Sequence, residues 1–176
     1  RELRLQSKEI TLKQQSFPLQ WAVDSSEFEM VVFKGYEAEY RKSNVTGLDQ
    51  LYYNRQKPYS RPIKFYDEYK AGLEVSGPTA YIIPQAWKEV ISRMEINGVK
   101  YERIKNDTLM EVEAYIIDDF KTGKDAYEGH YLHSDVKVRT GVRKINYRKG
   151  DYVIPMNQEC NRYIVETLEP HAPDSW

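Results

Sequence analysis

The fold is decided by residues 80–104, AYIIPQAWKEVISRMEINGVKYERI. Tyr81-Ile82-Ile83 is a short apolar, β-branched run that favours a strand, and Pro84 ends it. The i, i+3, i+4, i+7 spacing of an amphipathic helix follows, on Trp87, Val90, Ile91 and Met94. Asn97-Gly98 supplies a left-handed helix stop, and the alternation after it is typical of an extended segment. The stretch therefore predicts strand, helix, strand, with the helix over residues 85–97.

A second helix is predicted over about residues 159–168. Asn157 is a suitable N-cap, Pro170 stops the helix, and the expected buried stripe consists of Cys160, Tyr163, Ile164 and Leu168. Residues 109–118 alternate between apolar and polar side chains, as a half-buried antiparallel strand does, and residues 127–139 and 142–147 also read as strands. The predicted fold class is α+β, a mostly antiparallel β-sheet with two main helices.

The N-terminal half is predicted to be richer in strands. Residues 3–15 fit one or two exposed strands, and residues 27–40 are apolar on both parities, which is typical of a central strand covered on two sides. Residues 41–62 form a polar connection that is either a functional loop or the site of an edge strand. We place a boundary after Pro78, between a β-rich subdomain (1–78) and an α+β subdomain (79–176), with one continuous domain as the alternative.

Composition limits the function classes. The chain has 176 residues, of which 40% are hydrophobic and 30% charged, with a net charge of −1 and both signs interspersed. Electrostatic binding to nucleic acid needs a concentrated basic face, so we expect no nucleic-acid partner. No apolar run approaches the roughly 20 residues of a membrane span. The single cysteine, Cys160, excludes an internal disulfide and a cysteine-based zinc cage.

Four residues are the candidates for a catalytic or metal site. Glu111 and Glu113 share one face of a predicted strand, and Glu128 and His130 lie in the only local cluster of metal-ligand residue types. A small hydrolase would need all four to converge in one pocket. Alternating acids on a solvent-facing strand are common, so we assign no catalytic, cofactor-binding or metal-binding residue and expect no cofactor in this chain.

Tyrosine is the compositional outlier, with 15 residues against five phenylalanines and three tryptophans. Five of the tyrosines crowd around the long polar connection: Tyr52, Tyr53, Tyr59, Tyr66 and Tyr69. A free-standing glycan- or peptide-binding module could use them, because tyrosine rings stack on sugars and fill protein interfaces. Half-buried positions along a strand are the alternative use of the same residues.

A series of short strings carries a family resemblance. In chain order they are Phe33-Lys34-Gly35-Tyr36-Glu37, Tyr81-Ile82-Ile83-Pro84, Asn97-Gly98-Val99, Tyr127-Glu128-Gly129-His130, Gly150-Asp151-Tyr152, Val165-Glu166-Thr167-Leu168-Glu169-Pro170 and Ala172-Pro173-Asp174-Ser175. The series resembles the region after the catalytic domain in large bacterial zinc carboxypeptidase-like proteins of the carboxypeptidase A family. The likeness covers most of residues 28–176 and includes no catalytic motif.

The resemblance implies an accessory role. That family holds zinc with a His-x-x-Glu pair and a distant histidine, but here the residues three positions after the histidines are His133, Val136 and Asp174. The expectation is therefore a non-catalytic C-terminal region that packs on an upstream catalytic domain of the same polypeptide. Zinc is expected in that catalytic domain, and the resemblance implies a periplasmic or secreted protein.

Overall fold

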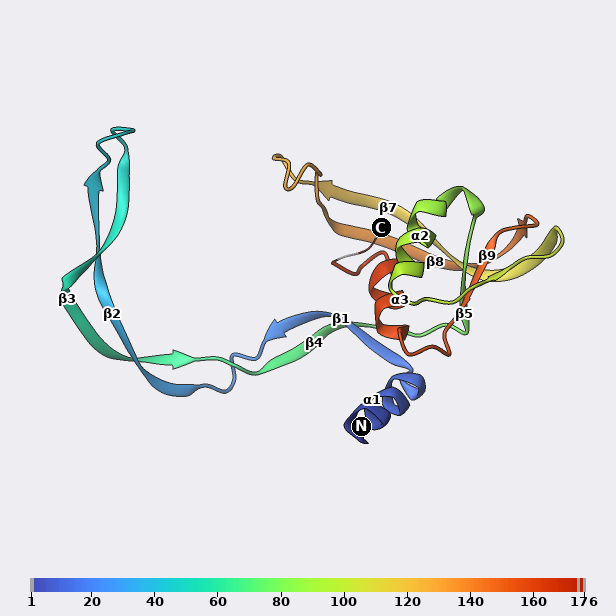
Figure 1. Ribbon diagram of the computed structural model, residues 1–176, viewed down its shortest axis with the longest axis horizontal. Helices are drawn as coiled ribbons and strands as arrows, with labels where there is room; N and C mark the ends of the chain where they lie inside the picture. Colours follow the sequence, from blue (N-terminus) through green and yellow to red (C-terminus); the bar gives the residue numbers. More distant parts are fainter. Residues whose placement is uncertain (1, 174, 176) are drawn as a thin grey trace. The chain divides into compact units, whose positions relative to one another are not determined.

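The computed structural model describes residues 2–173 and 175. Three α-helices, one 3₁₀ turn (η1) and nine strands follow one another along the described chain (Figure 1). In order they are α1 (Glu2–Lys13), β1 (Ser16–Val23), β2 (Glu29–Lys42), β3 (Asp49–Phe65), β4 (Tyr69–Ser76), β5 (Ala80–Ile83), η1 (Gln85–Trp87), α2 (Lys88–Ile96), β6 (Glu102–Arg103), β7 (Thr108–Thr122), β8 (His133–Tyr147), β9 (Tyr152–Pro155) and α3 (Asn161–Leu168). The paired strands are antiparallel, which confirms the predicted α+β class.

Contacts within the chain gather into two units. The core unit comprises the residues up to Trp21 and those from Ala71 onward, and the ribbon unit comprises Ala22–Lys70. The chain passes from the core unit into the ribbon unit within β1 and returns to the core unit within β4. The subdomain boundary after Pro78, between residues 1–78 and 79–176, stays a prediction.

The main hydrophobic core lies where α2 and α3 pack on a three-stranded sheet of order β5-β9-β6. The strand–helix–strand stretch supplies Ile83, Val90, Ile91, Met94 and Val99 to this core, and β9 and α3 add Tyr152, Ile154 and Ile164. A second, smaller cluster joins Phe17 and Leu19 of β1 to Val165 and Ala172. Residues 80–104 therefore organise the core as the sequence predicted.

Both predicted helices are present, but they begin later than expected. The first starts as the turn η1 and becomes α-helical at Lys88, so Trp87 falls out of phase with the buried stripe and is 61% exposed. The second starts at Asn161 with Cys160 as its N-cap residue, not Asn157. The buried Asn161 side chain instead accepts the Gln158 N–H at 3.0 Å and donates to the Met156 carbonyl at 2.9 Å. Cys160 is only partly buried against the core.

The prediction of strands over residues 3–15 is wrong, because Glu2–Lys13 is the helix α1. Its apolar residues are too unevenly spaced for a clear helical stripe, whereas Leu, Lys, Gln and Glu all have good helix propensity. Glu9 and Lys13 form an i,i+4 ion pair of 2.6 Å on its surface. No helix among residues 2–173 has the length and hydropathy needed to cross a membrane.

The ribbon unit is built from one long hairpin, β2–β3. Most of the predicted polar connection is therefore the strand β3. Opposite Tyr36 and Glu37, a bulge interrupts β3, because Arg55, Gln56 and Lys57 have no paired residue on β2. The prediction of a central strand covered on two sides is wrong for β2, since it pairs only with β3 and no residue of it is fully buried.

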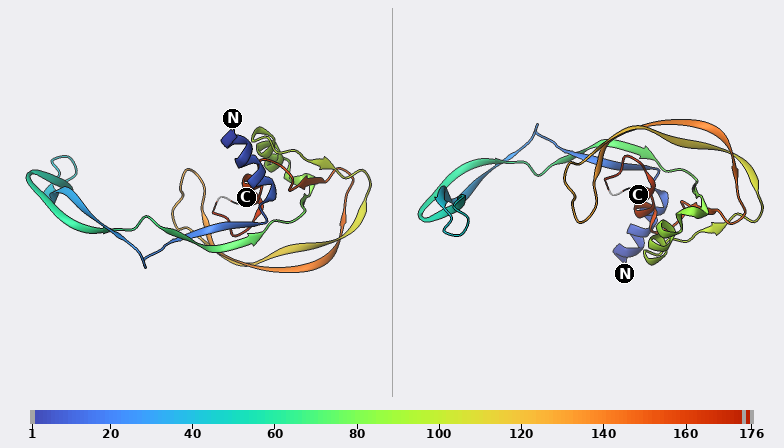
Figure 2. Two further views of the ribbon diagram at one scale, coloured as in Figure 1. Left: turned by 90° about the horizontal axis from the view of Figure 1, so that it is seen from below. Right: turned by 90° about the horizontal axis from the view of Figure 1, so that it is seen from above.

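A second hairpin, β7–β8, belongs to the core unit, and its strands run side by side in both views of Figure 2. The predicted strand over residues 109–118 is confirmed and extended. Residues 127–132 are not strand: Glu128 and Gly129 both have positive φ, of 49° and 83°, and Tyr127 and His130 exchange backbone hydrogen bonds of 2.8 and 3.0 Å. Positive φ at both central positions is typical of a type I′ turn.

Candidate functional site

The four candidate hydrolase residues do not converge. Glu111 and Glu113 lie exposed on β7, opposite Lys144 and Val142 of β8. Glu128 and His130 lie in the loop beyond the end of β7 at Thr122, so Glu113 is separated from them by roughly 30 Å of strand. Among residues 2–173 and 175, no group of three or more histidine, cysteine or acidic side chains could hold a metal ion. The arrangement offers no site for acid–base or metal chemistry on these residues.

Among the described residues, the most deeply buried acid is one that the sequence pattern did not reveal. Glu169, directly after α3, is 1% exposed and accepts hydrogen bonds from the Tyr81 hydroxyl of β5 at 2.5 Å and the Tyr115 hydroxyl of β7 at 2.7 Å. Burial, together with these bonds to a carboxylate, raises the pKa of both tyrosines above the usual value. Glu169 thus ties the β7–β8 hairpin to the sheet and to α3, which is a structural role.

Asp151 plays a comparable role at the start of α2. It follows Gly150, whose φ of +99° allows a tight turn, and its side chain is buried. Its two carboxylate oxygens accept the N–H groups of Gln85 at 3.0 Å and Arg148 at 2.7 Å. Asp151 therefore satisfies a free donor at the beginning of the helical segment and fixes the β8–β9 connection to it.

The five clustered tyrosines do not form one exposed row. Tyr53 and Tyr69 are exposed, whereas Tyr52, Tyr59 and Tyr66 are half-buried in contacts within the ribbon unit. Tyr59 lies opposite Gly35, its ring centroid 6.1 Å from that of Phe33, and the Arg61 guanidinium lies over its ring. The register puts Tyr53 on the opposite face of the hairpin from Tyr52 and Tyr59. The tyrosine surface for a glycan or peptide stays a prediction that this geometry does not favour.

A polar cluster surrounds Glu39 on the hairpin. Its carboxylate accepts hydrogen bonds from Lys57 Nζ at 2.7 Å, from the Tyr52 hydroxyl, and from Asn54 Nδ2 at 3.1 Å. The hydrogen bond from Lys57 is the largest of the effects that lower the pKa of Glu39 from 4.5 to about 2, ahead of the bonds from Tyr52 and Asn54. Because the groups come from both strands and from the bulge, the cluster fixes the register next to the bulge.

The Glu39 cluster predicts a pH dependence. A carboxyl group with a lowered pKa stabilises the folded ribbon fully above pH 4.5 and loses that contribution as the pH falls toward 2. We expect the Glu39 side-chain carboxyl carbon to titrate near pH 2 in a ¹³C NMR experiment. In Lys57→Met its midpoint should move upward by at least about one unit, since the strongest hydrogen bond is lost. A wild-type midpoint near 4.5 would contradict the cluster.

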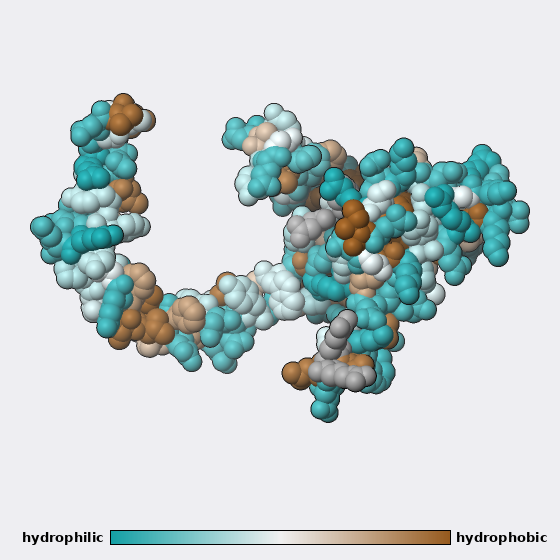
Figure 3. Space-filling model, in the orientation of Figure 1, coloured by the Kyte–Doolittle hydropathy of each residue, from teal (hydrophilic) through white to brown (hydrophobic). Residues whose placement is uncertain are grey.

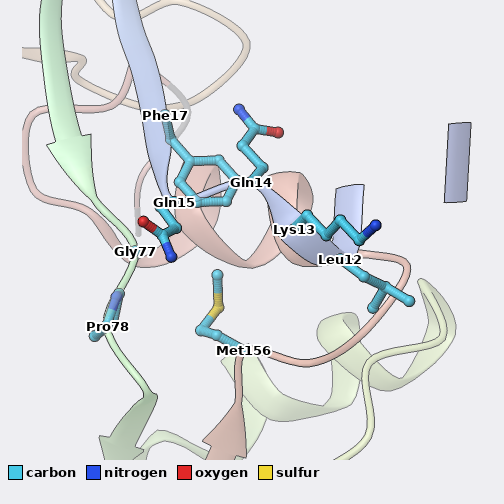
Figure 4. A pocket seen from close by; sticks show the side chains of 8 residues that line it. All are labelled: Leu12, Lys13, Gln14, Gln15, Phe17, Gly77, Pro78 and Met156. Carbon is cyan, nitrogen blue, oxygen red and sulfur yellow. The ribbon is translucent and has the colours of Figure 1, made fainter. Parts of the chain in front are cut away.

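Hollows in the described part of the core unit are further candidate sites. A pocket of about 340 Å³ is lined by the end of α1, by Phe17 and Met156, and by Gly77-Pro78 (Figure 4). A shallow groove of about 880 Å³ is lined by Leu12, Tyr101, Cys160 and neighbouring polar residues. Burial raises the pKa of the Cys160 thiol, so this cysteine is not activated as a nucleophile. Neither hollow brings together a set of catalytic groups.

The most unusual surface is one face of the β2–β3 hairpin. The register places six apolar side chains on it, all of them exposed: Met30, Val32, Tyr36, Tyr40, Leu51 and Tyr53. We call this set the apolar face. Tyr40 is 72% exposed and Val32 66%, and Figure 3 shows brown, hydrophobic side chains at the surface of the hairpin. The other face is partly covered by its own residues, since the rings of Phe33 and Tyr59 close over Gly35.

The ribbon unit has no hydrophobic core of its own. All of Ala22–Lys70 is described, and none of these residues is buried. A two-stranded hairpin without a covered face is marginally stable in water, and contiguous exposed apolar patches mark interaction sites. The ribbon unit is therefore the candidate interaction surface of this chain. The apolar pattern of residues 27–40 predicted a covered strand, but the ribbon unit supplies no cover of its own.

Comparison with known proteins relates part of the chain to carboxypeptidases. The chain is 31% identical over 107 residues to carboxypeptidase 2 of Trichophyton tonsurans, and this match covers 61% of the chain and 20% of that protein. Carboxypeptidase 2 of Trichophyton rubrum is 31% identical over 104 residues (59% and 19%), and the probable carboxypeptidase 2 of Arthroderma benhamiae is 30% identical over 105 residues (60% and 20%).

The match spans only about a fifth of the length of these relatives. No family model matches the sequence, and no solved structure matches it. The relatives named are fungal, so the predicted bacterial type and the zinc carboxypeptidase A class stay predictions. The chain contains a carboxypeptidase-related region, which confirms the predicted resemblance in its coarser form.

Proposed function

We propose that this chain is a non-catalytic accessory region of a longer zinc carboxypeptidase-like polypeptide. In this proposal the ribbon unit packs on the catalytic domain and helps to shape or stabilise its substrate cleft. The observation that carries the proposal is a 49-residue unit, Ala22–Lys70, with an exposed apolar face and no buried residue. The carboxypeptidase relatives, four-fifths of whose length lies outside the match, supply the class of partner.

Zinc belongs to the catalytic domain in this proposal. The residues of this chain do not fit the zinc site of that family, because no histidine is followed three positions later by glutamate. The described residues also gather no group of three metal-ligating side chains. In this proposal the chain contributes apolar surface. Export to the periplasm or beyond is part of the same proposal, through the resemblance.

A charge placed on the apolar face tests the proposal. In the complete polypeptide, Val32→Lys should lower both the thermal midpoint and the zinc-dependent release of C-terminal amino acids, because a packed interface disfavours an unpaired ammonium group. The matched control is Ile96→Lys on α2, where an 85% exposed apolar residue lies outside the ribbon unit. If both variants behave like the wild type, the apolar face is not covered and the accessory role fails.

A further inference from the structure

The β2–β3 hairpin has two outer edges, and within the described residues no third strand pairs with either. An unpaired edge presents a row of free N–H and C=O groups, which is a template for another strand. Proteins that keep such an edge free usually guard it with proline, charge or a bulge. The two edges of this hairpin differ in this respect.

Two prolines and a bulge hinder the addition of a further strand at the edge of β3. Pro58 and Pro62 lie within that strand, and the unpaired segment Arg55–Lys57 interrupts it. By contrast, β2 runs from Glu29 to Lys42 with no proline and with every residue matched to a partner on β3. The edge of β2 is therefore the one that can accept a further strand.

The two prolines also show which groups of β2 face outward. Proline has no N–H, so within a strand it occupies positions where that group would point away from the neighbouring strand. Pro62 lies opposite Val32 and Pro58 opposite Tyr36. Residues opposite each other in such positions form the non-hydrogen-bonded pairs of an antiparallel ladder, in which both partners direct N–H and C=O outward.

The pair Lys34 and Ser60, halfway between these two pairs, has the same orientation because the pattern repeats every second residue. The outer edge of β2 thus carries the N–H groups of Val32, Lys34 and Tyr36 at regular spacing. The neighbouring side chains are apolar on both faces of β2, with Met30 and Val32 on one side and Val31 and Phe33 on the other. A strand apolar on both faces fits against this edge.

We propose that the outer edge of β2 pairs with a strand of the carboxypeptidase domain of the same polypeptide. This inference rests on the proposed accessory function and adds to it the mode of contact, which is strand addition to β2 and not to β3. The occupant is taken from the part of the relatives that lies outside the match, about four-fifths of their length. Backbone hydrogen bonds fix the register of such a contact, and the apolar side chains on both faces strengthen it.

Amide hydrogen exchange tests the inference residue by residue. The amides of Val32, Lys34 and Tyr36 should exchange at least about tenfold more slowly in the complete polypeptide than in the 176-residue chain, since only the former supplies the partner strand. The outward amides of Ser60 and Lys64 on β3 are the internal control and should exchange rapidly in both. Equal protection of the two edges, or protection of neither, overturns strand addition at β2.

Two proline variants provide a matched pair, because Lys34 and Ser60 lie directly opposite each other. In the complete polypeptide, Lys34→Pro should abolish the protection of the Val32 and Tyr36 amides, whereas Ser60→Pro and the side-chain control Lys34→Ala should preserve it. Equal effects of the two prolines overturn the inference. Protection already present in a dimer of the 176-residue chain also overturns it, because the occupant would then be a second copy.

The experiments distinguish a failure of the proposed function from a failure of this inference. If Val32→Lys destabilises the complete polypeptide while the β2 amides stay unprotected, the apolar face is covered but no strand is added. If neither effect is seen, both proposals are wrong.

Discussion

Met94→Ala is expected to lower the free energy of unfolding by about 2–5 kcal/mol, the usual range for truncating a buried methionine. Met94 is fully buried in the main core, between α2 and the β5-β9-β6 sheet. The substitution removes apolar contacts on one side of this core and leaves a cavity that the rigid sheet cannot fill. Urea denaturation followed by circular dichroism at 222 nm measures the loss.

The control for this prediction lies two residues further along the same helix. Ile96 is 85% exposed, so Ile96→Ala should change the free energy of unfolding by no more than about 0.5 kcal/mol. Both variants place alanine on α2, and helix propensity alone therefore cannot produce a large difference. Similar losses in the two variants would mean that α2 does not pack on the sheet.

Glu169→Ala is expected to cost about 2–4 kcal/mol, because it leaves two partly buried tyrosine hydroxyls without an acceptor. Those hydroxyls belong to Tyr81 and Tyr115, which the carboxylate joins across β5 and β7. Tyr115→Phe in the Glu169→Ala background should add little to the loss, whereas alone it should cost about 1–2 kcal/mol. Urea unfolding of the wild type, the two single variants and the double variant gives the coupling free energy between Glu169 and Tyr115.

Glu166→Ala is the matched control on the same segment. Glu166 lies within α3 and forms an i,i+4 ion pair with Arg162 at the partly exposed surface. Pairs of this kind contribute only about 0.3–0.5 kcal/mol. If Glu169→Ala were no more destabilising than Glu166→Ala, the buried network would not hold the β7–β8 hairpin in place.

The core could be predicted from the sequence because its signals are local. The stripe that includes Met94 and the Asn97-Gly98 stop lie within a few residues of each other, and helical periodicity alone places them. The same reasoning failed on α1, whose apolar residues have no clear period and whose helix propensity was the better guide. It also placed Trp87 in the stripe, since a 3₁₀ turn before α2 changes the phase without changing the sequence pattern.

The buried acids could not be predicted because their partners are distant in sequence. Glu169 is 88 residues from Tyr81 and 54 from Tyr115. No spacing rule links such positions, and in the sequence Glu169 resembles any charged residue after a helix. Asp151 carried more of a signal, because glycine followed by aspartate is typical of a turn, although the sequence gives no sign of its bond to Gln85.

The sequence indicated only part of the candidate interface. The apolar residues on both parities of β2 indicated a strand covered on two sides, but the structure pairs β2 with β3 alone and leaves both faces without a covering layer from the ribbon unit. Hydrophobic periodicity shows that a face must be buried and does not show which part of a polypeptide buries it. Val32 and Tyr40 are exposed, so the ribbon unit does not itself cover the apolar face.

The most direct test of the accessory role compares one substitution in two contexts. In the 176-residue chain, Val32→Lys should leave the thermal midpoint nearly unchanged, because Val32 is 66% exposed. In the complete polypeptide the same substitution should lower the midpoint by several degrees, because the lysine would be packed against the catalytic domain. Equal midpoint shifts in the two contexts would contradict the account.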